Sequence, residues 1–364
     1  MRKYIREILF WINVLLAVTL FMAYMANFIN PARLWQIAFF GLAYPVLLLL
    51  NFGFIVFWIW HRKMLALISI FAILAGWSNV GRYFQIRTFS RSHKTEESLK
   101  LLSYNVRVFN QYGATIGGSQ LDSIMDFVNM QGADIVCFQE FFTNNGRTNT
   151  SEDYIDSSLN KLPYHHFSYS HKPSVYTNYG LATYSKYPII NKAVLKFKNS
   201  NNSCLYSDMI IFGDTVRVYN AHLQSISLKK KDYNFVDSLV FRFNSKRVDE
   251  VKDISGRLKH AFIKRAEQVD ILSGHIRKSP YPVIVCGDFN DTPVSYTYQK
   301  IRDDLQDAFV KAGKGTGNTY RGNFPSFRID FIFYSKSFRS LNYQTHRINL
   351  SDHYPVSCEI EVQP

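Results

Sequence analysis

Cysteine is scarce in this sequence. The 364 residues contain 4 cysteines, which are too few to form a disulfide framework in a protein of this length. Cys137 and Cys286 lie inside apolar runs and are predicted to be buried thiols. Cys204 and Cys358 would pair only in an oxidising compartment. The class of small disulfide-stapled domains is therefore excluded, and no internal repeat is visible that would indicate a repeat architecture.

Charge is missing from most of the first 90 residues. No charged side chain lies between Glu7 and Arg33, and the 22 residues 8–29 are apolar enough to cross ~30 Å of hydrocarbon as a helix. Two further apolar runs, 34–60 and 64–80, follow after short loops, which allow little besides chain reversal. Core helices of soluble domains, the alternative, seldom lack charge over such lengths. Residues 1–90 are therefore predicted to be a membrane anchor with three transmembrane helices.

Basic residues predict the orientation of this anchor. A secretory signal peptide would have one short apolar region and a cleavage site, whereas here two more apolar runs follow, so the segment is predicted to be retained. The loop lysines and arginines that mark cytoplasmic ends are Arg2, Lys3, Arg6, Arg62 and Lys63, against Arg33 alone in the other loop. Three crossings would place the rest of the chain outside the cytoplasm, which in a bacterium is the periplasmic side of the inner membrane. If the third run does not cross, that part is cytoplasmic.

The net charge of +14 is divided between two unlike parts. Residues 1–87 contain eight Lys/Arg and one Glu, so the remainder carries 34 minus 27, or +7. A moderate positive balance suits an anionic substrate or a phospholipid surface, and equally suits ordinary solubility.

Residues 98–364 are predicted to form one mixed α/β domain, because short apolar runs alternate with amphipathic stretches. Residues 120–130 have apolar positions at helical spacing, and Gly132 follows as a stop signal. Many strands with few helices between them favour two packed sheets covered by helices. The predicted strands are 99–106, 134–139, 180–184, 209–212, 215–221, 283–286, 329–334 and 356–362.

Residues 229–262 are predicted to be a basic insertion in this domain. The stretch 229–265 contains 11 Lys/Arg against five acidic residues, with aromatic residues among them. Such a stretch could lie against an anionic membrane or guide a polyanion, and a solvated helical insertion is the alternative.

The strongest local signal is the segment 283–290, Val-Ile-Val-Cys-Gly-Asp-Phe-Asn. An apolar strand ends here in two polar residues on alternate positions, so Asp288 and Asn290 are expected to point to the same side. Other apolar strands also end in residues that can handle a phosphate or a metal. These are Asn105, Glu140, His222, Asp330, Asp352 and His353.

In this order the motifs resemble the endonuclease/exonuclease/phosphatase superfamily, the DNase I-like group that includes nucleases, sphingomyelinases and inositol polyphosphate phosphatases. The resemblance covers residues 98–362. It rests on Tyr-Asn-Val at 104–106, Gln-Glu at 139–140, Ala-His-Leu at 221–223, Gly-Asp-Phe-Asn at 287–290, Arg-Ile-Asp-Phe-Ile at 328–332 and Ser-Asp-His-Tyr-Pro at 351–355. It implies a four-layer α/β sandwich with the site at one edge of two facing sheets.

The resemblance also implies a metal site. Glu140 would be the principal ligand of a divalent ion, Mg²⁺ or Mn²⁺, with help from Asn105, because carboxylate and amide oxygens suit a hard cation. Asp352 could bind the metal or support Asp288. The ion would polarise the scissile phosphate and stabilise the leaving oxygen.

The remaining family roles concern the phosphate and the water. Asp288 would orient or deprotonate the attacking water, while Asn290 and His222 would hold phosphoryl oxygens. His353 would contact the phosphate, with Asp330 accepting a hydrogen bond from its other nitrogen.

The substrate class stays open between three phosphoesters: a phospholipid headgroup near the bilayer, nucleic acid, or a phosphorylated small molecule. After Asn105 the chain continues with Val106 and Arg107, where abasic-site nucleases of the family carry an acidic residue, so that activity is disfavoured. Arg107 could meet a phosphate or form a surface salt bridge. A membrane-tethered nuclease is the main alternative to a lipid phosphodiesterase, and a phosphate-binding module without activity is the third. No feature of the sequence indicates a protein partner.

Overall fold

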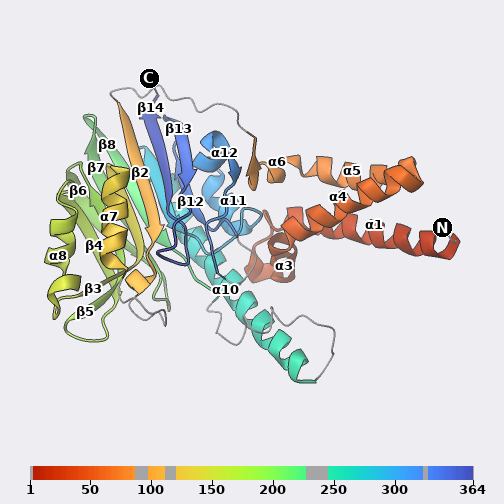
Figure 1. Cartoon of the computed structure of the whole chain (residues 1–364), viewed down its shortest axis with the longest axis horizontal. Helices are drawn as coiled ribbons and strands as arrows, with labels where there is room; N and C mark the ends of the chain where they lie inside the picture. Colours follow the sequence, from red (N-terminus) through yellow and green to blue (C-terminus); the bar gives the residue numbers. More distant parts are fainter. Residues whose placement is uncertain (1–2, 87–96, 111–119, 227–244, 323–326, 364) are drawn as a thin grey trace.

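The computed structural model describes residues 3–86, 97–110, 120–226, 245–322 and 327–363. An α/β domain occupies one end of the molecule and an N-terminal helical region extends from it (Figure 1). Residues 229–244 of the predicted basic insertion lie outside the described residues. From Ser245 the chain forms one helix, α10 (Ser245–Arg277), so the predicted boundary at residue 262 falls inside a continuous helix.

The α/β domain contains two six-stranded sheets. The first has the strand order β13-β14-β2-β3-β5-β4, and the second β10-β12-β9-β8-β7-β6. The strands of the first are β13 (Phe338–Thr345), β14 (Val356–Val362), β2 (Ser98–Asn105), β3 (Ile135–Asn144), β5 (Thr177–Ser185) and β4 (Tyr164–His171). Those of the second are β10 (Gln306–Asp307), β12 (Asp330–Tyr334), β9 (Val283–Asp288), β8 (Asp214–His222), β7 (Ser203–Ile211) and β6 (Ile189–Lys196).

Three apolar cores separate four layers. The inner faces of the two sheets pack on each other through residues such as Leu101, Cys137 and Ile284. The outer face of the first sheet is covered by α7 (Leu121–Gln131) and α8 (Glu152–Ser158), and that of the second by α10 and α11 (Tyr296–Arg302). The predicted α/β fold with two packed sheets is confirmed. All four cysteines are buried and free, so Cys204 and Cys358 are not paired.

The remaining short elements are connectors. They are η1 (Arg107–Asn110), η2 (Thr148–Thr150), α12 (Ala308–Ala312), and the two-stranded pair of β1 (Phe84–Gln85) with β11 (Gly315–Thr316). This pair joins the end of the N-terminal helical region to the α/β domain.

The N-terminal helical region differs from the three long spans that the sequence predicted. It consists of α1 (Lys3–Met25), α2 (Pro31–Leu34), α3 (Gln36–Leu42), α4 (Tyr44–His61), α5 (Lys63–Ala75) and α6 (Trp77–Val80). The run 34–60 is broken at Ala43, because Pro45 in the first turn of α4 cannot continue a helix from α3. The run 64–80 is broken at Gly76. Among the residues that the structure describes, two helices, α1 and α4, are long and apolar enough to cross a membrane, and α5 is shorter.

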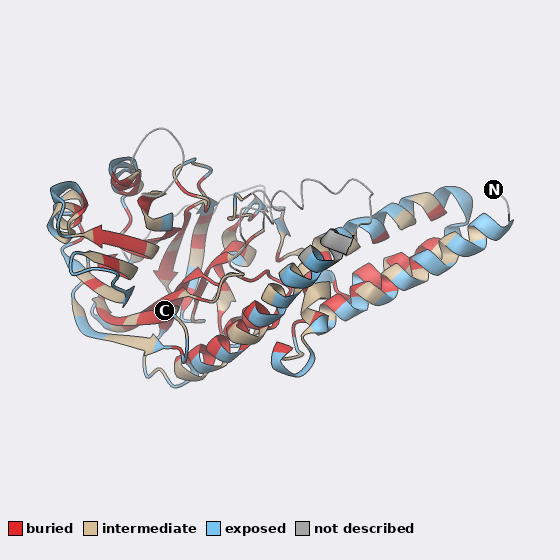
Figure 2. Ribbon diagram, turned by 90° about the horizontal axis from the view of Figure 1, so that it is seen from below, coloured by how far each residue is buried: buried red, intermediate tan, exposed pale blue. Residues whose placement is uncertain are grey.

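Polar side chains hold α1, α4 and α5 together. The Asn13 side chain donates to Ser69 Oγ at 2.6 Å, Ser69 donates to Asn51 Oδ1 at 2.9 Å, and Trp58 Nε1 donates to Asn13 Oδ1 at 2.9 Å. These four residues are buried, whereas the outward positions of the helices are exposed and apolar (Figure 2).

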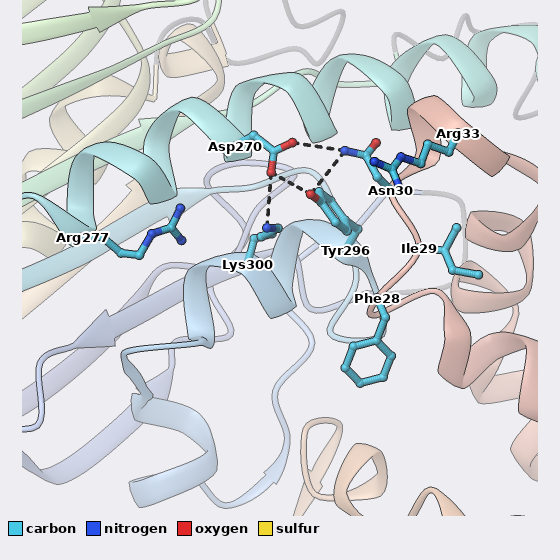
Figure 3. A pocket seen from close by; sticks show the side chains of 8 residues that line it. All are labelled: Phe28, Ile29, Asn30, Arg33, Asp270, Arg277, Tyr296 and Lys300. Carbon is cyan, nitrogen blue, oxygen red and sulfur yellow. Dashed lines mark hydrogen bonds and ion pairs between the residues drawn. The ribbon is translucent and has the colours of Figure 1, made fainter.

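The helical region is attached to the α/β domain by a polar junction, drawn in Figure 3. Asn30 Nδ2 donates to Asp270 Oδ2 of α10 at 3.1 Å and to the Tyr296 hydroxyl at 3.3 Å, and Tyr296 donates to Asp270 Oδ1 at 2.7 Å. Nearby, Arg82 donates to Asn27 Oδ1 at 2.8 Å and to the Pro293 carbonyl oxygen at 3.0 Å. The helices are thus tied to the loop that follows β9.

Candidate active site

The strand ends that carry the predicted residues meet at one edge of the two sheets. β2 and β3 are parallel, with Asn105 opposite Gln139, and β8 and β9 are parallel, with His222 opposite Asp288. The antiparallel strand β12 starts at Asp330, which lies opposite Asp288. Because the carboxyl ends of parallel strands lie at the same edge, these side chains gather there. The structure brings together Asn105, Glu140, His222, Asp288, Asn290, Asp330 and His353.

A bulge in β3 aims Glu140 at this site. The pairing of β3 with β5 shifts between Phe138 and Phe141, so that Gln139 and Glu140 together lie opposite Leu181. Glu140 has a left-handed backbone with φ 50°, which a non-glycine residue adopts at a cost. Its Oε1 accepts a hydrogen bond from Asn105 Nδ2 at 3.2 Å.

Three amide N–H groups donate hydrogen bonds to the Asp288 carboxylate. Asn290 donates its backbone N–H to Asp288 Oδ1 at 2.8 Å and its side-chain amide to Oδ2 at 3.2 Å, and Asn105 Nδ2 donates to Oδ2 at 3.0 Å. The carboxylate is 1% exposed. Burial raises its pKa, His353 opposes this rise, and the neighbouring Asp330 adds to it, so that the net pKa lies above the usual value.

Gly287 lets the backbone reach this position. Its φ is 142°, and a Cβ there would lie 1.9 Å from the carbonyl oxygen of Ala221 on β8. Only glycine fits so close to the neighbouring strand. The glycine of the Gly-Asp-Phe-Asn motif is therefore required by packing.

His353 is buried between two carboxylates. Its Nδ1 is 2.9 Å from Asp330 Oδ2, and its Nε2 is 3.8 Å from Asp288 Oδ2. Burial alone would lower the pKa of the imidazole, but the charges of Asp330 and Asp288 outweigh it and raise the pKa well above the ordinary value. The Tyr320 ring packs edge-on against the imidazole at 5.3 Å between centroids.

His222 supplies a buried polar atom without a hydrogen-bond partner. Its Nε2 is 3.7 Å from Asp288 Oδ2 and 3.8 Å from Glu140 Oε1, too far for a hydrogen bond to either. Buried polar atoms are rarely left without partners in native proteins. The imidazole is therefore placed to bind a ligand that enters between these carboxylates.

Asp352 lies at the edge of the site. Its Oδ2 is 3.4 Å from Arg107 Nε, and this salt bridge is one of the two roles that the sequence left open for Arg107. The preceding Ser351 donates its hydroxyl to the Asn105 carbonyl oxygen at 2.8 Å and so joins the loop before β14 to the end of β2. Asp352 is thus engaged by Arg107, and it lines the same cavity as Glu140 and Asp288.

The donor set at the site fits a divalent cation. Asp288, Asp330 and a neutral His353 would each offer one ligand atom, and these atoms lie within 4.8 Å of one another. Glu140 adds a further carboxylate. Asn105 turns its amide nitrogen towards Glu140 and Asp288, while its Oδ1 accepts a hydrogen bond from the Arg107 backbone N–H at 3.0 Å. Oxygen-rich sets of this kind suit Mg²⁺ or Mn²⁺.

Sequence reasoning placed Gln139 and Asn220 in strands that lead to the site but did not predict that they link the two sheets. Gln139 donates to Asn220 Oδ1 at 2.7 Å, and both are fully buried beneath the site, where they link the two sheets. Both were visible as polar residues inside buried strands, which is the signal that could have identified them. Tyr320 was also missed, and nothing in its loop sequence marks it.

Two family profiles match separate parts of this chain. The endonuclease/exonuclease/phosphatase family profile matches residues 102–353, and a domain of unknown function (DUF8431) matches residues 6–83. No curated protein matches the sequence.

Solved structures resemble the α/β domain at low sequence identity. An endonuclease/exonuclease/phosphatase from Beutenbergia cavernae DSM 12333 has a TM-score of 0.54 and 17% identity, covering 73% of this chain and 72% of that one. A second one, from Bacteroides vulgatus, has a TM-score of 0.53 and 16% identity, with 74% and 100% covered. The human Nocturnin catalytic domain with bound sulfate has a TM-score of 0.52 and 15% identity, with 74% and 96% covered.

These structures support the same fold, and the family match spans more than half of the chain and includes the buried Asp288, Asp330 and His353 cluster. This chain belongs to the endonuclease/exonuclease/phosphatase family of hydrolases.

Proposed function

We propose that this protein is a membrane-anchored, metal-dependent phosphodiester hydrolase in which Asp288 activates the attacking water. The proposal rests on the side chains that surround Asp288. Its buried carboxylate is held by Asn105 and Asn290 while the cationic His353 lies 3.8 Å away. A proton acceptor and a positive charge side by side suit attack of water on a phosphate.

In this reaction the water oxygen bonds to phosphorus as its proton passes to Asp288. The ester bond on the opposite side of phosphorus breaks, and the departing oxygen is protonated to an alcohol by solvent. A raised pKa makes Asp288 a better proton acceptor near neutral pH.

The histidines are proposed to bind the phosphate. The Nε2 of His353, with Nδ1 engaged by Asp330, donates to a phosphoryl oxygen, and the unpaired Nε2 of His222 binds another. Asn290 has its amide engaged by Asp288 and by the Leu223 carbonyl oxygen at 3.0 Å. This favours a positioning role for Asn290 over the direct phosphate contact that the resemblance implied.

Glu140 and Asn105 are proposed to hold the divalent ion, Mg²⁺ or Mn²⁺. Glu140 has a side chain that is 36% exposed, which leaves it room to coordinate an ion. When bound, the ion would stabilise negative charge on the phosphate and on the leaving oxygen. Asp352 would join as a ligand only by releasing Arg107.

Anchoring in a membrane is supported by the exposure of α1 and α4. In their most apolar 18-residue windows only 22% and 17% of residues are buried, whereas a core helix of a soluble protein would be mostly buried. The Asn13, Asn51 and Ser69 hydrogen bonds are of the kind that joins helices in a bilayer.

The orientation follows from basic residues at the far end of the bundle. Lys3 and Arg6 begin α1, and Arg62 and Lys63 form the turn between α4 and α5, away from the α/β domain (Figure 1). These residues would lie in the cytoplasm, which puts the catalytic domain on the periplasmic side of a bacterial inner membrane. At the opposite end Arg33, Arg277 and Lys300 surround the junction beside Phe28 (Figure 3), where phospholipid headgroups would lie.

The test is hydrolysis by the full chain in nanodiscs, with Mg²⁺ or with EDTA. The substrates are bis(p-nitrophenyl) phosphate, sphingomyelin vesicles, an inositol phosphate and plasmid DNA, each beside His353→Ala. We expect metal-dependent cleavage that the variant loses. Cleavage of plasmid alone would support the tethered nuclease, and no cleavage by folded, metal-loaded protein would support a binding module. Retained activity in His353→Ala would overturn the site assignment.

A further inference from the structure

A cavity of about 230 Å³ adjoins the proposed catalytic side chains. Glu140, Asp288 and His353 form one part of its lining. Most of the remaining wall is apolar and comes from separate segments of the chain. It is formed by Leu42 of α3, Ile226, Phe327, Ile329, and three residues of α10: Ile254, Leu258 and Phe262.

The α10 residues form one stripe of the helix, because they are four positions apart. Towards the C-terminal end of α10, buried residues such as Val269 and Leu272 pack on the second sheet. Ile254 and Leu258 are only half-buried and line the cavity instead. Ile254 and Leu258 therefore face the cavity and are not part of the core on the second sheet.

The cavity offers little to a polyanion. Among the described residues that line it, Arg265 is the one lysine or arginine. It is buried and already paired, with its Nε 3.1 Å from Asp291 Oδ2 and its Nη1 donating to the Gln224 carbonyl oxygen at 2.9 Å. Nucleic-acid paths need cations free to meet successive phosphates. An apolar group attached to a single phosphate fits this wall better.

We propose, on the basis of the proposed function, that the cavity binds the hydrocarbon part of an amphiphilic phosphoester, so that the substrate is a membrane lipid. The phosphate lies between Asp288 and His353, and the apolar portion lies against α10 and Leu42. Leu42 indicates that this substrate comes from the membrane, because α3 continues into the helices proposed to lie in the bilayer. Leu42 is therefore a specificity-determining residue contributed by the N-terminal helical region.

The test is a series of alkyl p-nitrophenyl phosphates with methyl, butyl and octyl chains, each below its critical micelle concentration. The full chain in phosphatidylcholine nanodiscs is assayed by p-nitrophenol release. Burial of one methylene corresponds to about threefold to fourfold in binding, so kcat/KM is expected to rise by at least tenfold from methyl to butyl. The rise stops once the cavity is filled.

Leu258→Gln and Leu42→Gln should each flatten this series and reduce the ratio of octyl to methyl kcat/KM by tenfold or more. Ile271→Gln is the matched control, because Ile271 lies on the same helix, is 48% exposed and does not line the cavity. Thermal unfolding of each variant shows that it is folded, and Ile254→Gln replaces any variant that is not.

Each result separates this inference from the proposed function. No metal-dependent release from the methyl ester refutes the hydrolase itself. Release from the methyl ester with a flat chain-length series in the wild type refutes the lipid-binding cavity alone. Faster cleavage of single-stranded DNA than of the octyl ester, unaffected by Leu258→Gln, would also overturn it.

Discussion

Asn105 donates its side-chain amide to both Glu140 and Asp288, at 3.2 and 3.0 Å. Asn105 and Glu140 belong to the first sheet and Asp288 to the second, so one amide connects the proposed metal ligand with the proposed base across the sandwich. The distance between these two carboxylates therefore depends on how the two sheets pack.

Asn105→Ala is expected to weaken Mg²⁺ binding, because it removes a proposed ligand and releases both carboxylates. A loss of about tenfold to a hundredfold in metal affinity is typical of such supporting contacts. Mn²⁺ binding followed by electron paramagnetic resonance measures it without relying on turnover. Asn129→Ala is the control, since Asn129 binds only the Ser158 carbonyl oxygen on the surface. Equal affinities in the two variants would contradict the assignment of Asn105.

Asp330→Asn is expected to lower kcat by about a hundredfold or more, because the imidazole of His353 loses the carboxylate that orients it. The double variant Asp330→Asn/His353→Ala should be no slower than His353→Ala alone, since groups that act as a unit are not additive. Single-turnover kinetics of the four proteins give the comparison. Additive losses would show that Asp330 acts independently of His353.

Gly287→Ala is expected to destabilise the domain by about 3 kcal/mol or more, because its Cβ would overlap the Ala221 carbonyl oxygen at 1.9 Å. Gly256→Ala on α10 is the matched substitution. A Cβ there meets nothing within 4 Å, so alanine should stabilise the helix by about 0.5–1 kcal/mol. Thermal unfolding of both variants measures whether the two changes in stability have opposite signs. A tolerated Gly287→Ala would mean that β8 and β9 are farther apart than described here.

Acid is expected to destabilise the α/β domain through His166 and His346. Burial lowers the pKa of each to about 4, against an ordinary value of 6.5. The unfolded chain therefore binds more protons than the folded one between these values, and stability is lost as the pH falls from about 6.5 towards 4. The melting temperature measured between pH 7.5 and 4.5 should fall, and His346→Gln should reduce the dependence. An unchanged slope in that variant would exclude His346 as a contributor.

The strand ends were predictable, whereas the shape of the site was not. Asp288 and Asn290 stand on alternate positions after an apolar strand, and together with the polar ends of the other strands this pattern predicted that they belong to the site. The bulge at Glu140 depends on pairing with β5, which no local pattern encodes. For the same reason the sequence did not predict that Asp352 pairs with Arg107, because a metal-binding role for Asp352 fitted the sequence equally well.

Hydrophobicity gave the extent of the N-terminal helical region but not its subdivision. The run 34–60 contains no charge, so its break at Ala43 follows from a single proline and from packing. Gly41 beside it would place a Cβ 2.4 Å from the Val294 carbonyl oxygen, so α3 touches the α/β domain closely. Contacts between segments more than 200 residues apart are invisible to residue patterns.

α3 and Arg82 pack against the loop after β9, so part of the N-terminal helical region belongs to the functional enzyme. A fragment that starts after residue 86 contains every residue proposed to do chemistry, yet it lacks Leu42 of the cavity wall and Arg82, which donates to the Pro293 carbonyl oxygen. Such a fragment would present an opened cavity to water. The functional enzyme therefore includes more than the catalytic domain. The helices that resemble a simple membrane anchor also complete the wall of the active-site cavity.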